Sequence, residues 1–70
     1  MTRQQIEAVL RTLRHMRGVA SQQFALAWTD LDQPPPPDAM DWQAVQVAHE
    51  SAIEMFEAML EDLGEAEGAT

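Results

Sequence analysis

Cysteine, tyrosine and lysine are absent from this 70-residue chain, and glycine occurs only three times. Without cysteine the chain can form neither a disulfide framework nor a thiolate metal site. No apolar run approaches the roughly 20 residues needed to cross a bilayer, and the first residues lack the charged-then-apolar pattern of a secretory signal. The sequence therefore predicts one small cytoplasmic domain with no membrane partner.

Groups that could carry catalysis are also scarce. No glycine-rich phosphate loop is present, and the hydroxyls of Ser21, Thr29 and Ser51 have no clear partner base. Carboxylates are numerous, but nothing in the sequence supplies a pocket that would separate the pKa values of a pair. We therefore expect a protein that is not an enzyme and that holds no cofactor.

Four consecutive prolines, residues 34–37, interrupt two long segments of apolar periodicity. Proline lacks a backbone donor and has a fixed φ, so this run cannot continue a helix. The pattern predicts an all-α chain. Its parts are a helix at about 3–32, a turn over 33–38, a second helix at about 39–63 and a frayed acidic tail over 64–70.

Capping residues support these boundaries. Thr2 and Gln5 have the spacing of a capping box, in which each side chain accepts a hydrogen bond from the other residue's free backbone N–H. Asp38 or Asp41 is expected to cap the second helix, and either favours the positive end of the helix dipole. Gly64 is expected to follow the last residue of that helix.

Both predicted helices carry a seam of residues spaced alternately by three and four, as in a coiled coil. The apolar arc of the second helix is wider than one partner helix would cover. We therefore expect an antiparallel two-helix hairpin that forms a homodimer, giving a four-helix bundle. The seams are Ile6, Leu10, Leu13, Arg17, Ala20, Phe24, Ala27 and Leu31, and Trp42, Val45, His49, Ala52, Phe56, Met59 and Leu63.

Folding the chain about the middle of the proline run sets a register between the helices. This register places Arg14 beside Glu57 and Arg11 beside Glu61. Exposed pairs of this kind contribute only about 0–1 kcal/mol each, so they select a register more than they stabilise the fold.

Charge is divided unevenly between the two halves of the chain, which has a net charge of −8. Residues 1–33 contain all four arginines and three acidic residues, whereas residues 34–70 contain nine acidic residues and no basic one. Such a surface repels nucleic acid and favours a basic protein. Four glutamates at helical spacing form what we call the acidic row: Glu50, Glu54, Glu57 and Glu61. The row is either a solvated helix face or a docking surface.

Three residues with ring side chains are assigned either to binding or to the core. Trp28 precedes the turn and is either an interface anchor or a residue that packs on the prolines. Trp42 lies on the seam and is expected in the core. His49 also lies on the seam, where it either fixes the register or, paired with its copy across a dimer, binds a metal. No Glu-x-x-His motif accompanies it, so we predict no metal site.

The opening residues Met1-Thr2-Arg3-Gln4 and the order Trp42, Val47-Ala48, Phe56 resemble Rop-like helical hairpins. The second stretch is similar to a Rop-like group associated with nitrogen-fixation operons. The resemblance implies a hairpin that dimerises. In the RNA-binding branch a basic and aromatic face of helix 1 grips RNA, and only Arg3 matches that face, so direct nucleic-acid binding is not expected.

The combined hypothesis is a small non-enzymatic, regulatory interaction module. It would bind a larger basic protein through the acidic row and Trp28. One alternative is a phage- or plasmid-type inhibitor that mimics nucleic acid and blocks a basic groove. Another is a helical bundle that binds metal through histidine and carboxylates.

Overall fold

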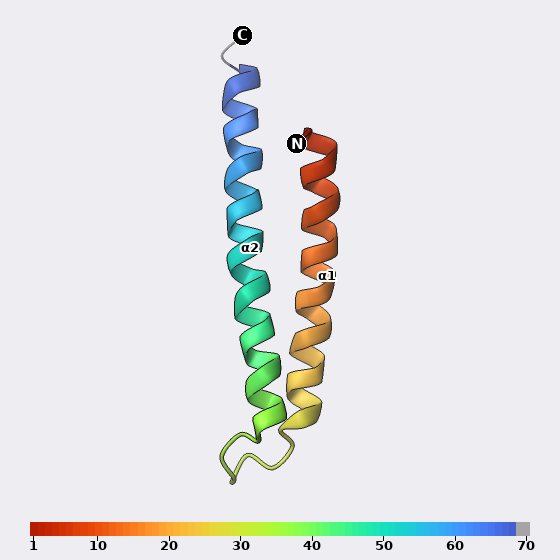
Figure 1. Ribbon diagram of the computed structural model, residues 1–70, viewed down its shortest axis with the longest axis vertical. Helices are drawn as coiled ribbons and strands as arrows, with labels where there is room; N and C mark the ends of the chain where they lie inside the picture. Colours follow the sequence, from red (N-terminus) through yellow and green to blue (C-terminus); the bar gives the residue numbers. More distant parts are fainter. Residues whose placement is uncertain (69–70) are drawn as a thin grey trace.

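The computed structural model describes residues 1–68, which form two helices joined by a loop (Figure 1). Helix α1 spans Arg3–Ala27 and helix α2 spans Pro37–Gly68. They run antiparallel side by side, and the molecule measures 57 × 16 × 13 Å. Residues 1–68 contain no strand. The predicted all-α hairpin is confirmed.

The start of α1 agrees with the sequence. The Gln5 backbone N–H donates to the Thr2 hydroxyl at 3.1 Å, and the Thr2 backbone N–H donates to Gln5 Oε1 at 2.8 Å. This reciprocal capping box satisfies two backbone donors that the first turn of a helix leaves free.

Helix α1 ends at Ala27, so its predicted extension to residue 32 was wrong. The Trp28 N–H still donates to the Phe24 carbonyl at 3.1 Å, but the next bonds are turn bonds. The Asp30 carboxylate accepts from the Asp32 N–H at 3.2 Å, and the Asp30 carbonyl accepts from the Gln33 N–H at 3.2 Å. A short side chain that accepts a hydrogen bond from a neighbouring backbone N–H competes with the helix in this way.

Helix α2 begins at Pro37, two residues before the predicted start at about residue 39. The carbonyl of Pro36 accepts the first helical bond, from the Met40 N–H at 3.2 Å. Proline is well suited to the first helical position because its missing N–H would have no partner there. Asp38 therefore lies in the first turn, where it still favours the helix dipole, and neither Asp38 nor Asp41 is the residue that precedes the helix.

The far end of α2 also differs from the prediction. The helix passes through Gly64 and continues to Gly68, and no described glycine has a positive φ. Glu65 and Ala66 are good helix formers, which offsets the cost of about 1 kcal/mol for glycine inside a helix. The predicted frayed tail over 64–70 is thus helical through residue 68, and residues 69–70 lie outside the described part.

The loop between the helices is centred on Asp32 and not on the proline run, because α1 ends early and Pro37 is helical. The register is therefore shifted from the predicted one by about a heptad, and Gln23 and Ala27 line a groove together with Trp42.

The core between the two helices is small. Its buried members Ile6, Leu10 and Ile53 pack with the partly buried Leu13, Phe56, Met59, Leu60 and Leu63.

Gly18 lies inside α1 with no atom within 4 Å of the position that a Cβ would occupy. Replacement by alanine should stabilise the fold by about 1 kcal/mol, because glycine loses more backbone entropy in a helix. For a domain of this size that corresponds to a rise in Tm of about 4–8 °C. Thermal unfolding at fixed concentration, followed by circular dichroism, measures it. An unchanged or lower Tm would contradict an uninterrupted helix at Gly18 and favour a hinge there.

Candidate interaction surfaces

One side of the hairpin is marked by an ion pair between the helices. Arg14 Nη2 lies 3.3 Å from Glu57 Oε2, and both side chains are about half exposed. The predicted pairing of these two residues is confirmed despite the shifted register. Side chains lean toward the N-terminus of their own helix, so in an antiparallel pair these two lean toward each other.

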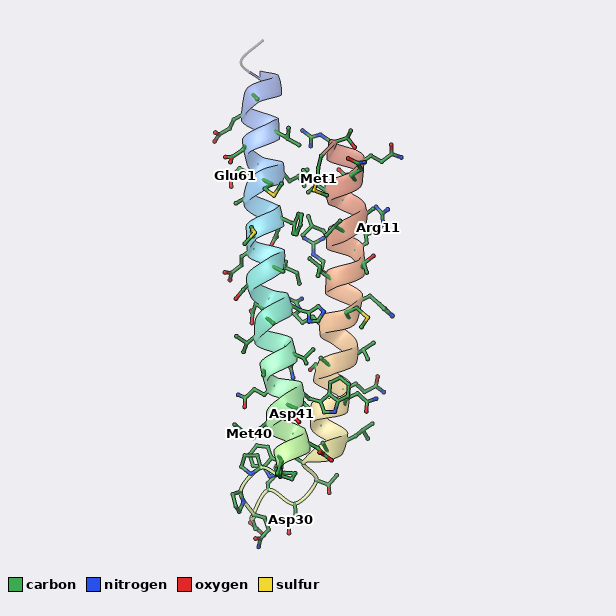
Figure 2. The ribbon with its side chains drawn as sticks, viewed as in Figure 1. Met1, Arg11, Asp30, Met40, Asp41 and Glu61 are labelled. Atoms are coloured by element: carbon green, nitrogen blue, oxygen red, sulfur yellow. The ribbon has the colours of Figure 1, made fainter. Side chains whose placement is uncertain are left out.

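The second predicted ion pair is not formed within the described residues. Arg11 points away from α2, and Glu61 points away from α1 (Figure 2). Glu61 is therefore left facing solvent with the other members of the acidic row. All four glutamates of the row are exposed, and α2 contains no basic residue that could neutralise them. Within the described residues the ion pair from Arg14 to Glu57 is the one cationic contact to the row.

The opposite side of the hairpin carries exposed apolar residues. Successive helical residues are about 100° apart, so Met16 and Met55, each two residues from a member of the Arg14–Glu57 pair, point about 200° away from it. Met16 is 43% exposed and Met55 is 64% exposed. Helical spacing adds further members to this side. We call it the uncharged face, and define it by Val9, Met16, Val19 and Leu26 of α1 with Val45, Ala48, Ala52 and Met55 of α2.

A groove on this side links the two helices. It is open, has a volume of about 430 Å³ and lies near the loop, between Leu26 and Gln23 of α1 and Asp41 and Trp42 of α2. Gln23 follows Met16 by one heptad, and Asp41 precedes Met55 by two heptads, so the groove belongs to the uncharged face. Asp38 and Asp41 border the groove, so the uncharged stretch of this side ends there, and Leu26 and Trp42 are the apolar side chains that line it from the two helices.

Trp28 is tied into the loop. Its indole Nε1–H donates to the carbonyl of Gln33 at 3.0 Å, and its ring meets Phe24 edge-on with a centroid distance of 5.9 Å. The side chain is half-buried. Its contacts are thus with Phe24 and Gln33, and the exposed part of the ring is what remains for a partner. Trp42 is also half-buried, on the wall of the groove.

His49 is half-buried on the seam, and its Nδ1 donates to the carbonyl of Val45 at 2.8 Å. This bond orients the ring and leaves Nε2 as the nitrogen available to a ligand. Among the described residues, no group of three or more histidine, cysteine or carboxylate side chains is placed to hold a metal ion. Neither described helix is long and apolar enough to span a bilayer.

Sequence reasoning recognised the wide apolar arc of the second helix and placed the acidic row opposite it. What it missed is that the apolar arcs of both helices lie on one side of the hairpin and together make the uncharged face. The signal was available, because the exposed apolar residues lie two residues from Arg14 and Glu57 along their helices.

Comparisons with models of protein families, with curated proteins and with solved structures found no match to this chain.

Proposed function

We propose that this protein is a non-enzymatic interaction module that forms a homodimeric four-helix bundle and binds a larger basic protein through the acidic row. The observation that carries the proposal is the segregation of charge. Four exposed glutamates follow one another along α2, a helix that holds no lysine or arginine. Neighbouring like charges on a helix repel by a few tenths of a kcal/mol per pair, and a basic partner would relieve this repulsion.

Trp28 belongs to the proposed surface as its aromatic end. It follows Arg14 by two heptads, which directs it to the same side of α1 as the ion pair with Glu57. A partly exposed indole at the loop end, on the same side as a row of carboxylates, suits an extended partner that offers both apolar and cationic side chains.

The test uses a synthetic alanine-based peptide with lysines at i, i+4, i+7 and i+11, the spacing of the acidic row. We expect the combined variant E50Q/E54Q/E57Q/E61Q to weaken binding of this peptide by at least about tenfold, because each lost charge removes part of the attraction. Fluorescence anisotropy of a labelled peptide at physiological salt measures the dissociation constant.

The matched control removes four carboxylates elsewhere, in the variant D30N/D32N/D62N/E65Q. It has the same net charge as the first variant, so it should retain binding within about threefold if position matters more than total charge. Equal losses in the two variants would overturn the acidic row as a site. With a captured natural partner, competition by DNA would distinguish mimicry of nucleic acid from ordinary protein recognition.

A further inference from the structure

We propose that the uncharged face is the surface that joins two copies of this chain, and that it leaves the two acidic rows on opposite outer sides of the dimer. The first part concerns the assembly alone. The second part rests on the proposed function, because it turns the dimer into a protein with two equivalent sites for basic partners.

The accessible surface of the chain favours a second copy as the occupant. The hairpin exposes 5158 Å². A compact monomer of this size would expose about 4,400 Å² by the usual scaling with mass. The excess of about 800 Å² equals the area that each partner buries in an interface of standard size. The small core also favours a second copy, since only five hydrophobic residues of the described chain are buried in the single hairpin.

The distribution of charge selects the face. On α1 the uncharged face contains no charged residue, and on α2 it contains none between Asp41 and Asp62. The arginines and the acidic row lie on other sides of the hairpin. A second uncharged stretch, with Met40, Ala44 and Val47, belongs to α2 alone, whereas the uncharged face draws residues from both helices. A chain with a net charge of −8 repels its own copy, and this repulsion is smallest where the central surface is neutral and apolar.

Geometry then fixes where the acidic rows lie. Glu57 points about 200° around α2 from Met55, so a partner that covers Met55 leaves the row exposed. A two-fold axis uses the same surface of both copies and places their rows on opposite outer sides. The dimer would therefore bind two basic partners, one per chain.

Oxidation of methionine in the unaltered protein tests the face directly. Met55 is 64% exposed in the hairpin and Met40, near the loop end of α2 (Figure 2), is 49% exposed. A free hairpin should therefore oxidise at Met55 at least as fast as at Met40. In the dimer we expect the order to reverse, with Met55 about tenfold slower, because hydrogen peroxide must reach the sulfur. Peptide mass spectrometry at micromolar chain concentration measures both rates, and Met55 reacting as fast as Met40 overturns the proposal.

Two matched substitutions give an independent test. Met55→Glu places a carboxylate on the uncharged face, and Val47→Glu places one at a similarly exposed position on the other side of α2. Met55→Glu should raise the dimer dissociation constant about 100-fold, because the charge would be buried without a partner. Val47→Glu should change it less than about threefold. Sedimentation equilibrium measures both dissociation constants. If only Val47→Glu dissociated the dimer, the interface would lie on the other side of α2 and the proposal would be wrong.

The stoichiometry of the lysine peptide tests the outward rows. Isothermal titration of the wild-type dimer should give one peptide per chain, and a value of one peptide per dimer would overturn the orientation. Absence of peptide binding would defeat the proposed function, while the oxidation and sedimentation results would still decide the dimer face.

Discussion

Replacing Leu10 by alanine should lower the free energy of unfolding by about 2–5 kcal/mol, because the side chain is buried and its neighbours cannot collapse fully into the cavity. Leu10 is 2% exposed and packs with Ile6 and Ile53. A domain of this size has only a few kcal/mol to lose, so the change removes a large share of its stability. Urea titration followed by circular dichroism at fixed chain concentration measures it.

Leu31→Ala is the matched control, because it deletes the same atoms from a side chain that is 73% exposed. It should change the free energy of unfolding by less than about 0.5 kcal/mol. The coiled-coil spacing assigned both leucines to one seam, whereas the structure places Leu31 in the loop. Equal losses in the two variants would support a helix 1 that reaches residue 32.

The hairpin itself could be predicted because periodicity and proline are strong local signals. A heptad seam favours a helix wherever it continues, and a proline run stops one. The helix ends could not be predicted as well, since they depend on weak local competition. The turn bonds of Asp30 end α1 before the prolines, and Pro37 is accepted as the first helical residue of α2.

The exposure of the acidic row could be predicted from the helical spacing of its glutamates alone, because charged residues at that spacing share one solvated face of a helix. The ion pair between Arg14 and Glu57 fixes how each helix is rotated about its own axis, and this places the apolar arcs of the two helices on the same side of the hairpin. The predicted register was shifted by about a heptad, and a shift of one heptad preserves which faces meet while it changes which residues are level. The predicted pair still forms because the two side chains lie on facing sides and lean toward each other, which spans the difference in level.

Trp28→Ala should destabilise the protein by about 2 kcal/mol, somewhat less than loss of a fully buried tryptophan, because the side chain is half-buried. The substitution removes both the edge-on contact with Phe24 and the indole bond to the Gln33 carbonyl. The first residues of the loop would then lose the contacts that hold them against α1. Urea titration under the conditions used for Leu10→Ala measures the loss.

Trp28→Phe separates the two contributions. Phenylalanine keeps an aromatic partner for Phe24, worth about 0.5–1.5 kcal/mol, and loses only the N–H donor. The bond to the Gln33 carbonyl is exposed, so water can replace the donor and the cost should be about 0.5–1 kcal/mol. A Trp28→Ala variant as stable as the wild type would show that the indole does not hold the loop. Its remaining role would then be contact with a partner, and the lysine peptide would be expected to bind that variant more weakly.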